Sequence, residues 1–517
     1  MKRIIFRQLP NIFFSVLCLV FIFLALRGQS GNPVAKELNT SSWKEDGPFE
    51  LSPERGRFAL TYSIVEDHSF YFSVPIAKFI IPDLGYKNGH YVSLFAPGVS
   101  FIAIPGYLVG RLLGVSQVGA FAFVSLFAIL NFVLIKLISK ALKASEIASW
   151  LAALVFLFAT PSFAYAVDLY QHHISTFLIL LATYIIIKAK RIWPLFFVWL
   201  LCAASISVDY PNLVLMFPIG VCAFFKMIHV QNMSGAFKVK IPITNLLVFV
   251  GVIFPLLFFM WFNYKSYGNP FQFSGTVASV REIDSSGNPA FPKTADPEHV
   301  DEYLHPEEQK KSVIVFFSSR AILNGLYMHF VSPDRGIIAF APVILFGIFG
   351  VVILFKQKSK FLPVLLGILG ADLVLYSMWG DPWGGWAFGS RYLIPAYAIM
   401  AIFISTALTN LKTKKLFMIP FYILLVYSIA VNTLGALTSN ANPPKVEVLE
   451  LEKLSGKQER YSFDRNWEFL ISGRSKSFVF QTYAAKYMTS VQYYYLITWL
   501  ITALSTGMVV LLWRKNE

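Results

Sequence analysis

The chain has 517 residues, of which 56% are hydrophobic and 14% charged, and its mean hydropathy is +0.59. This balance excludes an ordinary soluble globular protein and indicates a polytopic membrane protein. The 44 Lys and Arg residues against 29 Asp and Glu give a net charge of +15, but the basic residues stand in short groups between apolar runs. That distribution argues against nucleic acid as a partner and is typical of a membrane-topology signal.

The first apolar run, Ile12–Leu26, follows three basic residues. We expect a retained anchor there, because Ala25-Leu26-Arg27 lacks the small-x-small pattern of a signal-peptide cleavage site. Further runs long enough to span a bilayer predict an all-α fold of about twelve transmembrane helices. They are Gln117–Ile138, Ile147–Val167, Ile174–Ile187, Ile192–Val208, Leu213–Ile228, Ile241–Phe262, Gly336–Phe355, Phe361–Met378, Tyr392–Leu408, Leu416–Leu437 and Tyr493–Trp513.

The run Leu94–Leu113 is interrupted by Pro105, Gly106 and Gly110, so we expect an interfacial or re-entrant segment instead of a span. If this run is not counted as a membrane span, all the basic clusters and both termini fall on the same side of the membrane. The positive-inside rule identifies that side as the cytoplasm. The clusters are Lys2/Arg3/Arg7, Lys136/Lys140/Lys143, Lys188/Lys190/Arg191, Lys226/Lys238/Lys240, Lys356/Lys358/Lys360, Lys412/Lys414/Lys415 and Arg514/Lys515.

Polar segments with reactive side chains then all emerge on the opposite, non-cytoplasmic face. We expect a first external loop with interfacial helices, a second long external loop and a small external cap before the last span and its cytoplasmic tail. These segments are residues 27–113, 263–335, 438–490 and 491–517, and shorter external turns lie at 168–173, 209–212 and 379–391.

The first external loop contains the clearest helix start. In Ser52-Pro53-Glu54 the serine suits a cap, the proline the first position and the glutamate the first turn. Apolar residues then recur at helical spacing, which predicts an amphipathic helix along the membrane surface with its carboxylates in water. Glu54, Glu66 and Asp67 are each candidates for a general base acting on an acceptor hydroxyl. The alternative is a solvated helix face, with Glu54 serving the helix dipole.

A second constellation precedes the span that begins at Tyr392. Arg391 stands at the mouth of that span, where its guanidinium would bind a lipid-linked phosphate. Trp383 and Trp386 would offer stacking surfaces for a sugar, and an interfacial aromatic belt is the alternative explanation for them. Arg335 repeats the arrangement at the mouth of another span, where we expect a salt bridge with Asp334.

Histidines and one buried acid complete the candidates. His172 and His173, with Asp168 and His90, carry ligand atoms for a metal, but their spacing matches no metal signature. The sequence therefore assigns no metal site and no cofactor, and it leaves a divalent cation open. Asp372 lies in mid-span and must face the protein interior.

Several motifs, in order, resemble the glycosyltransferase C superfamily, especially its family 39 or protein-mannosyltransferase-like branch. The resemblance covers residues 1–437. The motifs are Arg57-Phe58-Ala59-Leu60-Thr61 leading into Val65-Glu66, Gly89-His90-Tyr91-Val92-Ser93, Ala96-Pro97-Gly98 with Pro105, His173 opening a span, Ser332-Pro333-Asp334-Arg335-Gly336 with Ala341-Pro342, Trp383-Gly384-Gly385 and Phe388-Gly389-Ser390-Arg391-Tyr392.

The resemblance implies a multi-pass enzyme of the plasma or inner membrane that serves the cell envelope. It would move a hexose or pentose from a polyprenyl-phosphate carrier to a protein, lipid or polysaccharide acceptor on the outer face. The catalytic base would be Glu54 or the Glu66-Asp67 pair, and Arg391 would hold the carrier phosphate. The residues expected to bind substrate are Arg57, His90, Tyr91, His173, Arg335, Trp383, Trp386, Arg391 and Tyr392.

The sequence departs from the family pattern at two positions. Phe95 stands where a lysine often precedes Ala-Pro-Gly, and the usual first-loop aspartate is a glutamate. Two other classes of function remain open. A transporter or flippase of a lipid-linked glycan would use Asp372 as an intramembrane relay, and a scaffold would present its outer loops to a partner.

Overall fold

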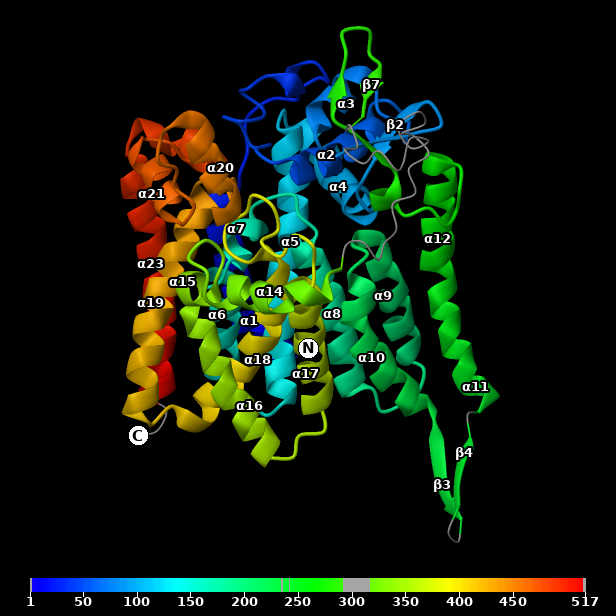
Figure 1. The fold of residues 1–517 in the computed structure, drawn as a ribbon. Helices are drawn as coiled ribbons and strands as arrows, with labels where there is room; N and C mark the ends of the chain where they lie inside the picture. The colour runs from blue at the N-terminus through cyan, green and yellow to red at the C-terminus, as the bar shows by residue number, and fades with distance from the viewer. Residues whose placement is uncertain (1, 234–235, 241, 292–316, 515–517) are drawn as a thin grey trace.

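The computed structural model describes residues 2–233, 236–240, 242–291 and 317–514. Figure 1 shows an upright bundle of helices below a layer of shorter elements. The bundle contains α1 (Lys2–Ala25), α5 (Ser116–Ala141), α6 (Glu146–Phe158), α8 (His172–Lys188), α9 (Leu195–Val208), α10 (Asn212–Met227), α11 (Ile243–Leu246), α12 (Val250–Tyr267), α16 (Gly347–Lys356), α17 (Leu362–Ser377), α18 (Ile394–Leu411), α19 (Lys415–Leu437) and α23 (Ser490–Arg514).

Shorter helices connect and cover the bundle. The connecting helices are α7 (Ser162–Ala166), α14 (Ile322–Phe330) and α15 (Ile337–Phe340), and the covering helices are α2 (Ser52–Val65), α3 (Val74–Ile80), α4 (Gly98–Leu112), α20 (Lys445–Ser455), α21 (Asp464–Ile471) and α22 (Phe478–Thr482). The region predicted as a cap, residues 438–490, holds α20, α21 and α22, and Figure 1 shows α20 and α21 at the upper ends of α19 and α23.

Five helices among the described residues are long and apolar enough to cross a membrane. Each of the other predicted runs contains a shorter apolar helix of 10–17 residues, so the expected count of twelve spans is not confirmed. One reason is the Thr160-Pro161 step. Proline has no N–H and disfavours helix at the preceding residue, so the predicted span Ile147–Val167 divides into α6 and α7.

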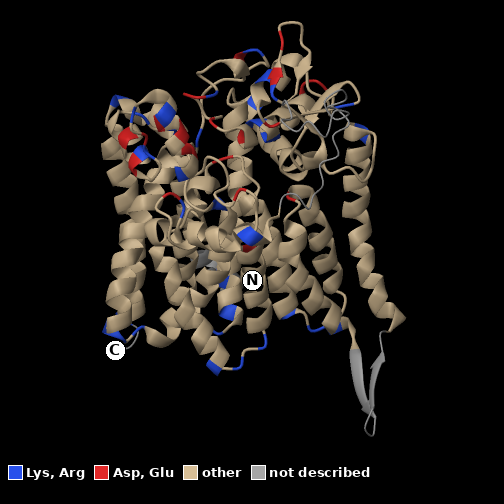
Figure 2. Cartoon of the chain, viewed as in Figure 1, with Lys and Arg blue, Asp and Glu red and all other residues tan. Residues whose placement is uncertain are grey.

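The two ends of the bundle differ in charge. Figure 2 shows Lys and Arg at the lower ends of the helices, whereas acidic residues gather in the upper layer and the cap. This charge asymmetry is the pattern from which the sequence predicted the orientation of the chain. The part of the second long loop at 292–316 lies outside the described residues.

The interrupted run Leu94–Leu113 forms α4, which Figure 1 shows in the upper layer beside α2. α4 turns back against α5 at very close range. A Cβ atom added at Gly106 would lie 2.3 Å from the Gly119 backbone oxygen, so only glycine permits this approach. Leu112 and Leu113, at the tip of the turn, are exposed, as an interfacial segment requires.

Short strands qualify the expected all-α fold. β1 (Leu84–Lys87) and β2 (His90–Ser93) form a hairpin, and β5 (Ala278–Val280) adds to β1, which joins the two long external loops. Asn88 and Gly89 both have positive φ, the conformation that a tight hairpin turn favours. The Asn-Gly pair was the available signal for this turn. Two further hairpins, β3 (His229–Met233) with β4 (Ala236–Lys240) and β6 (Glu282–Ile283) with β7 (Pro289–Ala290), lie elsewhere.

α2 begins at Ser52 with Pro53 in its first turn, as predicted. The prediction that Glu54 faces water is wrong, because every residue from 54 to 63 is buried. α3, α4 and the turn before α8 pack against the helix and cover its sides. Only the first two residues of α2 and its C-terminal end, next to Glu66 and Asp67, remain half-exposed.

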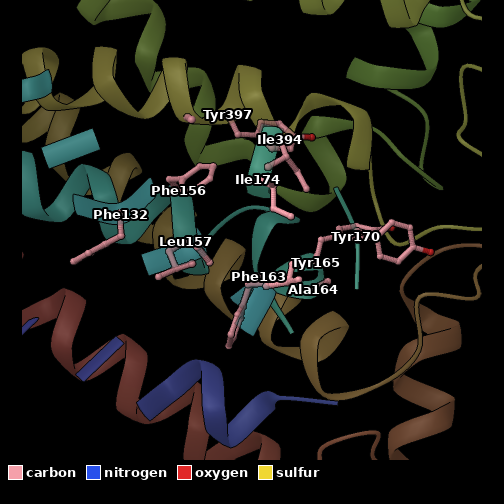
Figure 3. Close-up of a cluster of buried hydrophobic side chains, with 14 of the residues drawn as sticks. Phe132, Phe156, Leu157, Phe163, Ala164, Tyr165, Tyr170, Ile174, Ile394 and Tyr397 are labelled. Carbon is pink, nitrogen blue, oxygen red and sulfur yellow. The ribbon is translucent and has the colours of Figure 1, made fainter. Parts of the chain in front are cut away.

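The core centres on α18, whose apolar segment is 83% buried. Figure 3 shows part of this core, in which Phe156 and Ile174 lie close to Ile394 and Tyr397. Asp372 faces the interior as predicted, with no exposure, and accepts a hydrogen bond from the Ala396 N–H (2.9 Å). Tyr165 and Tyr170 lie at the edge of this core, and Tyr170 contacts Arg57 and Arg391 of the candidate site.

Candidate functional site

The candidate site forms where four segments meet above the core. These are the start of α2, the turn between α7 and α8, the turn between α9 and α10, and the segment that leads into α18. Arg57 of α2 links three of them. It donates to Gln171 Oε1 (2.5 Å), and Gln171 Nε2 donates in turn to Asp209 Oδ2 (3.1 Å). Arg57 is buried, yet it stands in none of the ion pairs of the described residues.

The Tyr170 ring contacts two guanidinium groups. The Cζ atom of Arg57 is 5.5 Å from the ring centroid, and the Cζ atom of Arg391 is 5.2 Å from it. Arg391 also lies 5.5 Å from the Tyr392 ring, while Phe95 contacts Arg57 at 4.8 Å. Arg391 is half-buried and, within the described chain, has no carboxylate at ion-pair distance. Two cations therefore share one aromatic pocket, which suits an anion.

Several buried polar atoms gather at this pocket without a hydrogen-bonding partner among the described residues. They are the Tyr170 hydroxyl, His172 Nε2 and Arg391 Nε, and the two Glu54 carboxyl oxygens have no partner other than the carboxyl group of Asp168. The His172 ring stacks on Tyr170, with centroids 5.7 Å apart and planes at 12°. Because buried polar groups are nearly always paired in folded proteins, such a cluster indicates a place for a ligand.

Glu54 lies against a second buried carboxyl group, that of Asp168. Burial raises the pKa of Glu54 well above its usual range, and the negative charge of Asp168 raises it further. Burial also raises the pKa of Asp168, but Arg27 and the Leu169 N–H act against this rise. Because burial and the repulsion between the two groups both oppose a second negative charge, we infer that the pair favours holding one proton between them.

Arg27 anchors the opposite side of this pair. Its Nη1 atom lies 3.4 Å from Asp168 Oδ2 and 3.3 Å from Glu50 Oε2, and its Nη2 atom donates to Asn440 Oδ1 (3.0 Å). Lys476 completes the network at 3.1 Å from Glu50 Oε1. The network therefore ties the end of α1 and the first loop to the cap.

Tyr170 connects the carboxyl pair to the two cations. Burial raises the pKa of Tyr170 well above its usual value, and the charges of Glu54 and Asp168 add to the rise, whereas Arg391 lowers it. The tyrosine is thus close enough for the charges of Glu54, Asp168 and Arg391 to change its pKa. Glu54 and Arg391, which the sequence placed on the same face of the membrane, both lie near this one aromatic residue.

Glu66 and Asp67 lie at the far end of α2, about 18 Å from Glu54 by helical rise. Glu66 pairs with Arg111 (3.0 Å) and accepts from the Tyr107 hydroxyl (2.8 Å). Asp67 accepts a long hydrogen bond from Ser63 (3.4 Å). Neither carboxylate approaches the pocket around Tyr170, and their contacts account for both as structural residues of the first loop.

We expect Glu66→Gln to leave the activity of the site unchanged and to lower the stability of the protein by no more than about 1 kcal/mol. The Glu66–Arg111 pair is partly exposed, at 19% and 50%, so water already screens it. Thermal unfolding of the purified protein in detergent measures the change. Arg111→Gln serves as the matched variant, and a loss of activity in Glu66→Gln alone would return Glu66 to the candidate bases.

Other predicted binding residues lie apart from the pocket. His90 stacks on Tyr71 at 4.1 Å, and the Tyr91 hydroxyl donates to the Gly287 carbonyl (2.8 Å). His173 lies in the core, where its ring contacts Asn131 (3.3 Å) and the Ser162 carbonyl (2.8 Å). These contacts separate His90 from His173. Within the described part of the chain no group of three or more His, Cys, Asp and Glu is placed to hold a metal.

Arg335 is fully buried and bound to backbone oxygens. It donates to the carbonyls of Trp383 (2.9 Å), Gly385 (2.9 Å), Asn442 (2.9 Å) and Asp334 (2.7 Å). The expected salt bridge with Asp334 is therefore wrong. The Asp334 carboxylate instead accepts from the Ser332 hydroxyl and the Lys445 N–H, because the entry to α20 competes for it.

The aromatic residues before α18 divide between cap and pocket. Trp386 donates to Glu447 Oε2 (2.6 Å) and packs below Arg465, so it fastens the cap. Tyr392 stacks on Tyr376 (4.3 Å, 8°) next to Arg391. Trp383 is half-buried, and its carbonyl holds Arg335.

An apolar cavity of about 230 Å³ begins close to this pocket. Its lining includes Leu393, two residues after Arg391, and apolar side chains of α14, α16, α17 and α18. Helices α14 and α16 also expose large apolar residues, among them Leu323 and Ile348. A hydrocarbon chain entering from the bilayer would fit this lining.

Sequence reasoning missed Tyr170, Gln171 and Asp209 as members of the site, and it considered Asp168 only as a metal ligand. A signal for them existed, because polar residues at the outer ends of apolar runs converge wherever the helices pack together. The sequence also offered no reason to connect Arg27 with Glu50, Asp168 and the cap.

No protein-family model and no curated protein sequence matches the chain. Among solved structures, ArnT from Cupriavidus metallidurans in the apo state is 13% identical, over 98% of this chain and 78% of that one, with a TM-score of 0.45. The same protein bound to undecaprenyl phosphate is 12% identical, over 97% and 78%, with a TM-score of 0.43.

The archaeal oligosaccharyltransferase AglB from Archaeoglobus fulgidus, in complex with an inhibitory peptide and a dolichol-phosphate, is 12% identical over 97% of this chain and 56% of that one, with a TM-score of 0.39. These TM-scores are low and do not confirm family 39. The helices themselves define a mostly helical membrane protein, with a closed, charged site at one end of its bundle.

Proposed function

We propose that the protein is a membrane glycosyltransferase that moves a sugar from a polyprenyl-phosphate carrier to an acceptor hydroxyl on the non-cytoplasmic face. One observation carries the proposal. Tyr170 contacts two arginines that form no ion pair among the described residues, and the buried Glu54–Asp168 pair and further unpaired polar atoms lie near it, while Leu393, two residues after Arg391, lines an apolar cavity. A ligand that combines a hydrocarbon chain, a phosphate and a sugar would fit all of these features.

The two arginines would bind the carrier phosphate. Arg391, at the start of the span and beside the apolar cavity, meets the phosphate where it leaves the hydrocarbon. Arg57 contributes from α2, and its bond to Gln171 fixes its direction. The apolar cavity would receive the first part of the carrier chain, and Tyr170, His172 and Tyr392 would border the sugar.

Glu54 is the preferred general base. The acceptor oxygen would attack the anomeric carbon of the sugar and form the new glycosidic bond, while the bond from that carbon to the carrier phosphate breaks. The electron pair leaves with the phosphate, whose charge the arginines stabilise, and the hydroxyl proton passes to Glu54 in its ionised form, after the proton held by the carboxyl pair has left Glu54. Attack on the face opposite the leaving group inverts the anomeric centre.

The direct test is transfer by purified protein in proteoliposomes. A panel of radiolabelled polyprenyl-phosphate sugars would be offered with lipid, peptide and polysaccharide acceptors, with and without a chelator. Product that carries the label supports the proposal, and the chelator arm decides the cation requirement. Movement of the labelled carrier across the bilayer without transfer would favour a flippase instead.

Arg391→Lys is expected to raise the KM for the donor about 10-fold while leaving the protein folded, since lysine keeps the charge but loses the planar pair of donors. Initial rates across donor concentrations measure the effect. Arg111→Lys, a change to a half-exposed arginine outside the pocket, is the matched control. Equal KM values for the two variants would remove Arg391 from the phosphate site.

A further inference from the structure

A large cavity lies at the other end of the bundle from the candidate site. It encloses about 580 Å³ and is bordered by three segments. These are the turn between α5 and α6, the turn between α16 and α17, and the last residues of α18. Figure 2 shows that this is the end at which basic residues gather.

Three lysines border the cavity, Lys143 from the first turn and Lys358 and Lys360 from the second. None of the ion pairs found in the described chain includes any of them. Glu146, the acid nearest in sequence, is occupied by Lys136 (2.9 Å) and Lys140 (3.2 Å). The cavity lining itself contains no carboxylate. Its positive charge is therefore uncompensated within the described structure.

The backbone holds two of these lysines in an unfavourable conformation. Lys143 has φ of 69° and Lys358 has φ of 50°, the left-handed region in which glycine and asparagine are preferred. A cation at a helix C-terminus gains from the helix dipole, which explains a basic residue near each turn. It does not explain why lysine occupies the left-handed position itself, twice, at the rim of the same cavity.

The walls of the cavity are preformed. α16 packs so closely on α18 that a Cβ atom added at Gly350 would collide with the Phe403 carbonyl. The Ser145 N–H donates to Thr409 Oγ1 (2.9 Å) and fastens the first turn to α18. Thr406, which also lines the cavity, is 3% exposed, and its hydroxyl has no hydrogen-bonding partner among the described residues. An oxygen-rich ligand would satisfy it.

One side of the cavity is apolar. Leu354 and Phe361 line it, and the neighbouring Phe355 and Val352 on α16 are 74% and 47% exposed. An occupant with phosphate oxygens for the lysines and Thr406, and with hydrocarbon for the adjoining face of α16, is a membrane lipid. We propose that this cavity binds the phosphate headgroup of an anionic phospholipid from the leaflet opposite the candidate site.

Native mass spectrometry of the purified protein in detergent tests the proposal. Phosphatidylglycerol, phosphatidylcholine and inorganic phosphate would be titrated separately. We expect retained phosphatidylglycerol, with phosphatidylcholine and phosphate binding far more weakly. The variant Lys143→Asn/Lys358→Asn/Lys360→Gln keeps residues suited to the left-handed positions and should bind phosphatidylglycerol at least about tenfold more weakly.

The matched control is Lys412→Gln/Lys414→Gln/Lys415→Gln, which removes as many charges from the neighbouring turn between α18 and α19. The control should keep the affinity of the native protein. Equal losses in the two variants would reduce the effect to general attraction by a basic surface and overturn the proposal. Binding of inorganic phosphate as tight as that of the lipid would overturn it too.

Two single variants keep the proposal testable if the triple variant fails to fold. Thr406→Val keeps every charge and should still weaken phosphatidylglycerol binding. Lys360→Glu, at an exposed position, should weaken it more strongly. Unchanged binding in both would contradict the proposal. These outcomes are independent of sugar transfer, because the measurement needs neither donor nor acceptor.

Discussion

Glu54→Gln is expected to lower kcat for sugar transfer by about 10²- to 10⁴-fold, the usual contribution of a general base. Glutamine keeps the size and shape of the side chain but cannot accept the hydroxyl proton. The raised pKa of Glu54 indicates that its buried surroundings favour an uncharged side chain, so the substitution should not disturb the fold. Initial rates at saturating donor, with unfolding temperature as the check on folding, measure the result.

The pH profile should identify the same group. Burial and Asp168 raise the pKa of Glu54, and only its ionised form accepts a proton. Transfer should therefore rise with pH along an acid limb centred above the ordinary glutamate pKa of about 4.3. Glu54→Asp should retain that limb at reduced rate, whereas Glu54→Gln should lose it.

Glu66→Gln is the matched control for this substitution, since it makes the same chemical change on the same helix. Native turnover in Glu54→Gln, or an unaltered acid limb, would contradict the assignment of the base. Loss of turnover in Asp168→Asn as well would agree with a shared proton, because Asp168 sets the charge of its partner.

The sequence predicted the helices well because apolar runs reveal them directly. Each predicted span contains an apolar helix, and α2 begins at the residue that its Ser-Pro-Glu start indicates. The sidedness of the polar loops also followed from the basic clusters. These are local properties, which neighbouring residues determine.

The surroundings of the site were less predictable because they depend on contacts between distant segments. Glu54 sits on a helix that reads as amphipathic, yet α3, α4 and the turn before α8 bury it. Arg57 meets Gln171 across 114 positions of sequence, and no periodicity encodes that contact. The N–H groups of Arg335 donate to backbone carbonyls of a folded loop. The sequence could not predict these bonds, because the neighbouring Asp334 indicated a salt bridge instead.

The strongest prediction on stability concerns Arg27. Arg27→Met is expected to cost about 3–5 kcal/mol, because it leaves Asp168 and Glu50 buried without their shared cation. Arg27 has no exposure, and it connects α1, the first loop and the cap. A methionine fills most of its volume, so the loss would reflect charge more than a cavity. Unfolding in detergent, monitored by temperature or denaturant, measures it.

The control is Arg474→Met, which removes an exposed arginine from the cap and should change stability by less than about 0.5 kcal/mol.

The loss of stability in Arg27→Met should also depend on pH. The raised pKa values of Glu54 and Asp168 mean that the folded protein holds protons that the unfolded chain releases. Stability should therefore fall as pH rises through the folded pKa values, and more steeply without Arg27. Adding Asp168→Asn to Arg27→Met should restore part of the loss. A deficit that neither pH nor this second substitution changes would show that Arg27 acts through packing alone.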